Sequence, residues 1–407
     1  MSVVFDPRDP AVLEDPYPIL RALQADDPVH WSEPLKSWVL TRYEDVRAAL
    51  ADARLSADRL TPFLRHEATM RPAGAAALAE LGRSLGLWAV FTDPPLHTRL
   101  RSLMTRAFTP RAVEALRPRV QALVDTLLDR VAERGRLDLI RDFAYPLPVA
   151  VIGDLIGVPR EDGEWLKRWS DDLAAFVGSS VATPDKYGRA ARSLGEMNAY
   201  FRTLAAERRA RPREDILSAL VAAHEDGRLA GEDELVATCT ILLFAGHETT
   251  TNLIGNGMLA LLRHRDQYER WRRDTALTPR AVEELLRFDG PGQSLVRVAA
   301  QDLVLHGRPI RRGERLFLMI NAANRDPRRF DDPDRLDLGR DPNPHLTFGH
   351  GLHACVGAPL ARLEAQIALP TLLRRLPDLE LAATRLEWLD SLIFRGVRAL
   401  PLTFQAR

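Results

Sequence analysis

The run Phe348–Gly357 has the composition expected around a chemically active cysteine, Cys355. Three glycines lie in this run, and an amphipathic helical pattern begins just after it, at Pro359. Glycine lets a backbone approach a bulky flat group closely and supplies the positive φ of a tight turn. A helix amino terminus stabilises a thiolate through its dipole and its free amides. The alternative is a buried structural cysteine, and that description fits Cys239, inside an apolar helical pattern, better than it fits Cys355.

A second group of reactive side chains interrupts a long apolar pattern. Gly246 and Thr249–Thr251 are poor helix formers, and threonine hydroxyls can bond carbonyls of the preceding turn and bend a helix. Such a local conflict inside a buried helix is expected at a functional site. It would place the acid of Glu248 and a hydroxyl beside an apolar floor. By helical spacing, one face would carry Ile241, Phe244, Ala245, Glu248, Thr249 and Asn252.

Two further pairs have the spacing of neighbours on a helix surface. Glu284 and Arg287 are three residues apart and can form a charge-assisted pair, although surface ion pairs of little energetic weight share this spacing. His97 and Arg101 are four residues apart, follow a helix-start signal at Asp93, and face one way. Considered alone, each pair could equally consist of ordinary surface side chains.

Other motifs lack the context that their chemistry needs. The run Gly255–Ala260 has a dinucleotide-like glycine spacing, but it lies inside a helical pattern rather than between a strand and a helix. His247 and Glu248 begin like a zinc-protease motif, but Thr251 stands where the second histidine ligand is needed. The histidines and cysteine of the run 350–355 lack the second ligand pair of a structural zinc site. The chain contains no Gly-x-Ser-x-Gly segment, so an α/β-hydrolase has no nucleophile here.

Helical periodicity dominates the elements that must position these residues. In Arg111–Arg134 apolar residues recur at steps of three and four and predict one continuous helix. Strand-like runs are short and do not alternate regularly with helices, which argues against a Rossmann-type fold. We therefore expect one mainly α domain over residues 1–407 with small peripheral β-sheets, and a long ordered meander at Asn324–Pro344. Other helical patterns cover Asp15–Ala25, Glu44–Ala53, Ala191–Ala206, Glu232–Leu262, Pro279–Phe288 and Pro359–Leu376. The strand-like runs are Ser37–Thr41, Leu303–Leu305, Leu316–Ile320 and Ala399–Phe404.

Composition excludes several classes of protein. The 407 residues include 56 Lys and Arg and 56 Asp and Glu, so the chain has no net field with which to hold nucleic acid. Two cysteines cannot build a disulfide scaffold and favour a reducing compartment. Residues 1–9 lack the apolar core of a signal peptide. The uncharged runs Leu235–Gly246 and Thr249–Leu262 are shorter than the roughly 20 residues of a membrane span. We expect a cytoplasmic protein without a membrane span.

The run 348–357 resembles the haem-binding loop of the cytochrome P-450 superfamily, Phe-x-x-Gly-x-(Arg/His)-x-Cys-x-Gly, with every fixed position present. Ala245–Thr250 is similar to the distal-helix motif of that family, and Glu284–Arg287 looks like its Glu-x-x-Arg pair. Asp93–Arg101 is similar to the start of its third helix. These motifs follow the family's order, and the resemblance covers about residues 15–404, so it implies the cytochrome P-450 fold, of the soluble bacterial type.

The resemblance also implies a cofactor and roles for its motifs. Haem b would be bound through the Cys355 thiolate, a mode of ligation that favours O–O cleavage. Glu248 and Thr249 would relay the protons that dioxygen cleavage consumes. Arg335, in the meander, would complete a staple with Glu284 and Arg287, although Leu336 replaces a frequent Phe beside it. The haem propionates would be held by His97, Arg101, Arg297 and His353. Further implied haem contacts are Ala245, Gly246, Phe348, Gly349 and Gly357.

The implied activity is monooxygenation of an apolar small molecule. One atom of dioxygen would enter a C–H or C=C bond, and the other would leave as water. A separate ferredoxin or flavodoxin-like protein would deliver electrons on the face behind Cys355, because no such module is fused, and we expect a monomer. Alternatives are a haem-thiolate peroxygenase or isomerase, which often dispenses with the acid–alcohol pair, and a non-enzymatic haem sensor. The stretches Phe63–Trp88 and Trp165–Tyr187 would form a mobile entrance. The implied substrate contacts are Phe244, Ala245, Leu295, Ile393 and Phe394.

Overall fold

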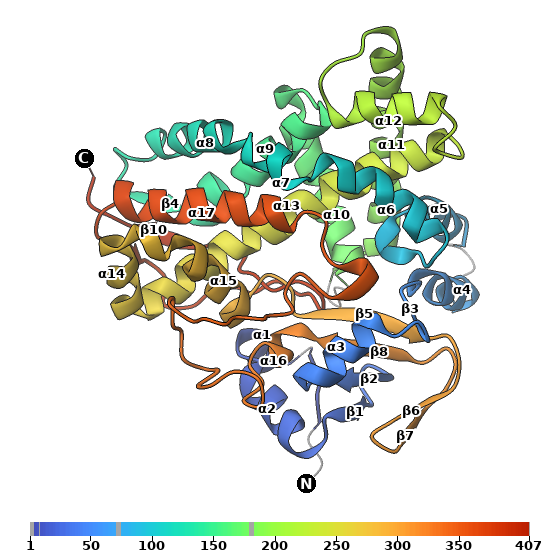
Figure 1. The fold of residues 1–407 in the computed structure, drawn as a ribbon, viewed down its shortest axis with the longest axis horizontal. Coiled ribbons are helices and arrows are strands. Elements are labelled where there is room, and N and C mark those ends of the chain that lie inside the picture. Colours follow the sequence, from blue (N-terminus) through green and yellow to red (C-terminus); the bar gives the residue numbers. More distant parts are fainter. Residues whose placement is uncertain (1–3, 8, 71–74, 179–182, 407) are drawn as a thin grey trace.

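The structure, a computed structural model, describes residues 4–7, 9–70, 75–178 and 183–406. Helices make up most of the molecule, and the largest sheet lies at the edge that carries the amino terminus (Figure 1). The sheets have five, three and two strands, so the prediction of a mainly α fold with small peripheral sheets is confirmed. None of the helices in the described ranges combines the length and the apolar character needed to cross a lipid bilayer.

Six of the seven predicted helical patterns each correspond to an α-helix whose bounds differ by a few residues, whereas no pattern was predicted for α4, α5, α9, α10, α12 and α14. In the described chain the α-helices are α1 (Pro10–Glu14), α2 (Tyr17–Asp26), α3 (Tyr43–Ala51), α4 (Leu60–Met70), α5 (Ala75–Leu85), α6 (Leu96–Ala107), α7 (Pro110–Glu114), α8 (Arg117–Asp129), α9 (Pro146–Ile156), α10 (Gly163–Val177), α11 (Lys186–Ala210), α12 (Ile216–Glu225), α13 (Glu232–Arg263), α14 (Arg265–Arg273), α15 (Thr278–Asp289), α16 (Ile320–Ala323) and α17 (Ala358–Arg375). Short helical turns are η2 (Ala89–Phe91), η3 (Ile140–Ala144), η4 (Arg160–Asp162), η5 (Thr275–Leu277) and η6 (Gly351–His353).

The five-stranded sheet has the order β1-β2-β8-β5-β3 and brings β5 beside the functional residues. β5 runs antiparallel to β8, with Leu295 opposite Leu318 and Arg297 opposite Leu316. The sequence did not predict β5, because both of its faces are largely buried and the polar–apolar alternation of a half-exposed strand is missing. The strands are β1 (Val29–Ser32), β2 (Ser37–Leu40), β3 (Leu55–Ser56), β4 (Arg136–Asp138), β5 (Ser294–Ala299), β6 (Leu303–Leu305), β7 (Arg308–Ile310), β8 (Arg315–Met319), β9 (Glu380–Leu381) and β10 (Pro401–Thr403).

The long helix α13 crosses the middle of the molecule and packs against α9 and α17 (Figure 1). Acidic residues fill its first turn, where the helix dipole favours negative charge. At Gly246 the neighbouring α9 comes very close: a Cβ on this residue would lie 2.7 Å from Ile152 Cγ1. The glycine of the predicted motif is therefore required for the contact between two helices.

The prediction of one continuous helix over Arg111–Arg134 was wrong. Two helices, α7 and α8, occupy this stretch, and α8 ends at Asp129. Pro118 lies in the first turn of α8, where its missing N–H is not needed, but that N–H would be needed to continue a helix from α7. The meander prediction holds, since residues 324–350 contain neither helix nor strand.

Candidate functional site

A central cavity of about 970 Å³ lies between α13 and the segment that contains Cys355. Both walls are mainly apolar, and β5 and the turn at 391–394 contribute Leu295, Ile393 and Phe394 to the lining. The cavity can therefore enclose a flat apolar group between two walls. On α13 the lining residues are Leu242, Ala245, Gly246, Thr249, Thr250 and Leu253. Opposite them lie Thr347, Phe348, Cys355, Val356, Gly357, Leu360, Ala361 and Glu364.

The cysteine loop, residues 348–357, is closed by its own backbone. The Cys355 amide donates to the Phe348 carbonyl at 2.7 Å, so the two ends of the loop meet. Gly349 and Gly351 have φ values of 72° and 73°, which other residues rarely adopt. The predicted role of glycine in a tight turn is therefore confirmed at these two positions. Gly357 has an ordinary φ and instead ends the loop at the start of α17.

The Cys355 sulfur faces the central cavity and is surrounded by hydrogen-bond donors and positive charge. Burial raises the pKa of the Cys355 thiol, and the backbone amides of Gly357 and Ala358 oppose that rise. The Arg101 guanidinium also opposes it and donates to the Ala354 carbonyl of the same loop. The loop thus presents a sulfur whose negative charge would be supported by two amides and by two cations, Arg101 and Arg362.

Three of the predicted anion-binding residues lie together beside this loop. The rings of His97 and His353 are 4.1 Å apart between centroids, and the positive charge of Arg297 acts on both histidines. His97 and Arg297 are buried, and neither His97 Nδ1 nor Arg297 Nη2 has a hydrogen-bond partner in the described chain. Burial and Arg297 lower the pKa of His353 to about 4. Buried donors without acceptors are costly, so this group suits a bound anion.

The predicted Glu284–Arg287 staple is a fully buried ion pair that binds the meander. Arg287 donates to both Glu284 carboxylate oxygens at 2.7 and 2.8 Å, and its remaining bonds go to backbone carbonyls of residues 324, 333 and 335. The expectation that Arg335 supplies the third charge was wrong. Arg335 has an exposed side chain and contributes only its carbonyl oxygen, whereas Arg340 donates to Glu284 at 3.2 Å. Arg340 lies five residues after Arg335 in the irregular meander. Sequence spacing alone therefore could not show which of the two arginines reaches Glu284.

Glu248 and Thr249 face different spaces, contrary to the prediction that they share one face of the helix. Thr249 lines the central cavity, and its hydroxyl donates to the Ala245 carbonyl at 3.3 Å. Glu248 instead lines a second space, which we call the polar cleft, together with Asn252 of the next turn. Consecutive helix residues are about 100° apart, so the acid and the hydroxyl lie on adjacent faces. Glu248 therefore lies between the polar cleft and the wall that carries Thr249.

The polar cleft has a volume of about 1110 Å³ and is lined by ionisable side chains. Burial, with a contribution from the nearby Asp171 charge, raises the pKa of Glu248 to about 7. A hydrogen bond from Asn252 at 3.3 Å and the Lys167 charge act in the opposite direction. Such a pKa lets Glu248 both hold and release a proton near neutral pH. Other charged or ionisable residues of the cleft are Tyr145, Arg189, Asp390 and Arg398.

Of the predicted substrate contacts, Ala245, Leu295, Ile393 and Phe394 line the central cavity. Phe244 does not line it. This residue is buried one layer behind, with ring centroids 5.3 Å from Trp88 and 6.3 Å from Phe394. The face of α13 that lines the cavity contains Ala245 and Thr249. Phe244 lies on the adjacent face of the helix and points into the helical core. Residues 71–74 and 179–182 of the two predicted entrance stretches lie outside the described residues.

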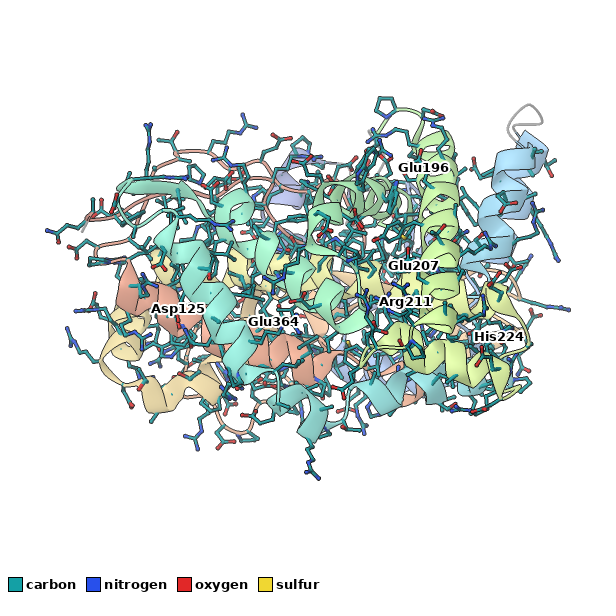
Figure 2. All side chains as sticks on the ribbon, turned by 90° about the horizontal axis from the view of Figure 1, so that it is seen from above. Asp125, Glu196, Glu207, Arg211, His224 and Glu364 are labelled. Carbon is teal, nitrogen blue, oxygen red and sulfur yellow. The ribbon has the colours of Figure 1, made fainter. Side chains whose placement is uncertain are left out.

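Sequence reasoning missed one acid of the central cavity altogether. Glu364 of α17 lies near the centre of the molecule (Figure 2) and lines the cavity on the side of the cysteine loop. Burial raises its pKa well above the ordinary value, and its Oε2 has no partner in the described chain. A carboxyl group in this environment is neutral. The helical repeat of α17 could have indicated that position 364 faces inward. Because glutamate is usually a surface residue, the residue type argued against that reading.

Comparison with known proteins decides the family. The family model described as Cytochrome P450 matches residues 186–381. The chain is 44% identical over 373 residues to Cytochrome P450 107B1 of Saccharopolyspora erythraea, an alignment that covers 90% of this chain and 89% of that protein. The chain belongs to the cytochrome P450 family. Over 400 residues it is 43% identical to the P450 monooxygenase PikC of Streptomyces venezuelae, covering 96% of this chain and 91% of PikC. The solved P450BioI, in complex with hexadec-9Z-enoic acid ligated acyl carrier protein, matches it with a TM-score of 0.89 at 39% identity, covering 97% of this chain and 99% of that one.

This P450 is a monooxygenase that uses haem iron, dioxygen, a small-molecule substrate and a redox partner. Its own residues fit haem. The apolar walls of the central cavity match a porphyrin, and the Cys355 sulfur lies in one of them. The unpartnered nitrogens of His97 and Arg297 supply donors for carboxylate groups at the edge of the cavity.

Proposed function

We propose that this P450 binds haem b through the Cys355 thiolate and oxidises an apolar small molecule in the central cavity. His97, Arg101, Arg297 and His353 would hold the propionates, and Gly357, which lines the central cavity, would let the cysteine loop approach the porphyrin closely. When bound, the haem supplies the reduction and cleavage of dioxygen, for which thiolate ligation is suited. The observation that carries this proposal is the Cys355 sulfur in an apolar cavity directly opposite a helix that carries Thr249.

The chain's own contribution to the chemistry is proton delivery. Glu248 takes a proton from water in the polar cleft on its carboxylate oxygen, and a raised pKa keeps that proton available at neutral pH. The Thr249 hydroxyl lines the central cavity, and in the structure its proton is donated to the Ala245 carbonyl. Turned towards the cavity, the hydroxyl would give this proton to the substrate side and take a replacement from Glu248. Because Glu248 and Thr249 line different spaces, the proton would pass from the polar cleft to the central cavity between adjacent faces of α13.

The lining of the central cavity favours an apolar substrate. Leu295, Ile393 and Phe394 face it, and its hydroxyl-bearing lining residues are Thr249, Thr250, Ser294 and Thr347. With few polar groups to orient a ligand, a C–H or C=C bond would be positioned by shape, giving hydroxylation or epoxidation. Phe244 shapes the cavity indirectly, by supporting the Phe394 ring.

The proposal extends to the setting of the protein. We infer a single haem domain over residues 1–407 that works as a monomer in the cytoplasm. Electrons would come from a separate ferredoxin or flavodoxin-like protein that docks behind the cysteine loop. The near-zero net charge and the lack of a basic field support a small-molecule enzyme rather than a nucleic-acid-binding one.

The ferrous carbon monoxide spectrum tests the ligation, because thiolate and imidazole ligands give different absorption bands. We expect the thiolate band, and its loss in Cys355→Ser. Turnover with a ferredoxin or flavodoxin system should oxidise an apolar substrate, while turnover with peroxide alone would instead favour a peroxygenase. Protein that binds no haem, or a Cys355→Ser variant with unchanged pigment and activity, would refute the proposal.

A further inference from the structure

A third space, which we call the arginine cavity, lies beside the central cavity and is described by neither the motifs nor the mechanism. It has a volume of about 870 Å³, and most of its lining is apolar. Phe63 and Leu60 of α4, Phe176 of α10 and Phe91 of η2 form one side. Val296, Phe317 and Leu392 form the other. These elements belong in part to the two stretches that the sequence predicts as the entrance.

Arg59 and Arg315 place two positive charges in this apolar lining. Among the described residues that line the cavity, Lys186 is also cationic and none is an acid. The Arg59 guanidinium lies 5.1 Å from the centre of the Phe91 ring and reaches a carbonyl, that of Val177, only at 3.5 Å. Arg315 donates to the Leu35 carbonyl at 3.2 Å. Neither arginine forms an ion pair within the described chain.

Two guanidinium groups without counter-ions in a mainly apolar cavity lower the stability of the folded protein. Burial lowers the pKa of Arg59 to about 10, and it lowers the pKa of Arg315 as well. Two other arginines of the described chain that are buried form ion pairs, Arg287 with Glu284 and Arg208 with Asp215, whereas the buried Arg297 is assigned above to an anion. An anion brought by a ligand would satisfy the two charges and form charge-assisted hydrogen bonds.

The arginine cavity and the central cavity are lined by residues of one hydrophobic cluster. Val296, Phe317 and Leu392 belong to the same hydrophobic cluster as Ile393 and Phe394, which line the central cavity. The two spaces are therefore adjacent, and a molecule that reaches across this shared wall from the central cavity would place its other end near Arg59 and Arg315. We propose that Arg59 and Arg315 form a carboxylate-binding subsite, so that the preferred substrates are long apolar molecules with a terminal carboxylate, oxidised near the end remote from that carboxylate. This inference rests on the proposed function.

The test compares three probes with the same chain, namely dodecanoic acid, dodecan-1-ol and dodecyl phosphate, by their effect on the spin state of the ferric holoprotein at neutral pH. We expect the acid to bind at least tenfold more tightly than the alcohol. Arg59→Gln and Arg315→Gln should each reduce that ratio severalfold, and the double variant should bring it close to one. Arg315→Lys, which keeps the charge, should retain most of the ratio. The matched control is Arg273→Gln on exposed α14, where the ratio should not change.

Product analysis shows which carbon of the chain is oxidised, which the spin state does not report. Wild-type protein should oxidise dodecanoic acid at carbons near its methyl end, and the double variant should spread oxidation along the chain. Equal binding of acid and alcohol by wild type, or an unchanged ratio in both single variants, would overturn the inference. Tighter, arginine-dependent binding of the phosphate would overturn the choice of a carboxylate.

Two control measurements distinguish a failure of the carboxylate subsite from a failure of the proposed function. Haem content per polypeptide must be the same in Arg59→Gln and wild type, since loss of haem would assign Arg59 to a propionate and overturn its place in the subsite. The carbon monoxide spectrum is recorded on each sample. If the thiolate band is absent, the proposed function fails; if it is present and the acid has no advantage, only the carboxylate subsite fails.

Discussion

Replacing Glu248 by Gln should make the protein more stable at alkaline pH and less active at every pH. The pKa of Glu248 is raised from 4.5 to about 7 because its carboxylate is surrounded by protein and faces the Asp171 charge. A group with a raised pKa stabilises the folded state only while it is protonated. Its favourable contribution is complete below about pH 4.5 and is lost as the pH rises through about 7. Glutamine carries no charge at any pH, so the variant does not suffer this loss.

The size of the effect follows from the shift. Each pKa unit corresponds to about 1.4 kcal/mol, so a shift of about 2.5 units is worth at most about 3 kcal/mol at pH 8. Water in the polar cleft screens part of this, which makes about 2 kcal/mol the expected gain in unfolding free energy. At pH 5 most of this loss has not yet occurred, so the variant and the wild type should differ by less than about 1 kcal/mol. Turnover should fall by about 10²-fold or more in Glu248→Gln, because a positioned general acid is lost.

Urea unfolding of the ferric holoprotein at pH 5, 6, 7 and 8 measures the first effect, and the rate of product formation with the redox partner measures the second. Glu283→Gln is the matched control, since bonds from Arg362 and His345 lower the pKa of Glu283 to about 2. That variant should be less stable than wild type at pH 7, the opposite sign. A stability difference for Glu248→Gln that does not vary between pH 5 and pH 8 would refute the raised pKa.

Three other variants test separate parts of the structure. Cys355→Ser should abolish the thiolate carbon monoxide band while the far-ultraviolet circular dichroism stays helical; retention of the band would contradict axial ligation. Glu284→Gln should destabilise the protein by about 3–5 kcal/mol in urea titrations, because a fully buried guanidinium loses its counter-ion. Glu114→Gln, at an exposed ion pair, should leave the unfolding midpoint nearly unchanged, and equal shifts in both variants would count against the staple. Phe394→Ala should change the ligand profile in spin-state titrations more than Phe244→Ala does, which should mainly lose about 3–5 kcal/mol of stability; the reverse order would return Phe244 to the cavity.

The sequence was informative wherever chemistry depends on local spacing. The glycines and cysteine of residues 348–357, and the i,i+3 pair Glu284–Arg287, could be predicted because their partners are a few residues away. Long-range contacts were harder. Arg340 and Arg335 both lie in an irregular segment, and only the path of the meander decides which side chain reaches Glu284. Helical geometry explains why Glu248 faces a separate cleft, but which side chains line that cleft depends on how α10 packs against α13.

The same limit applies to the arginine cavity. Arg59 and Arg315 are 256 positions apart in sequence, and each resembles an ordinary surface arginine. β5 was not predicted because its two faces are both covered, so the neighbours it brings together could not be inferred from periodicity. Residues whose environment is made by several distant segments carry little signal in a single sequence.

The bonds of Arg287 to three meander carbonyls, and the contact of Asn324 with Thr347 at 2.9 Å, have a practical meaning for recombination among relatives. Residues from about Glu284 to Arg362 form one block of mutually dependent backbone, so a chimera with a crossover inside it would join halves that evolved against different partners. Crossovers placed before α15 or within α17 beyond Arg362 would exchange the entrance and the distal helix while keeping the meander and the cysteine loop from one parent.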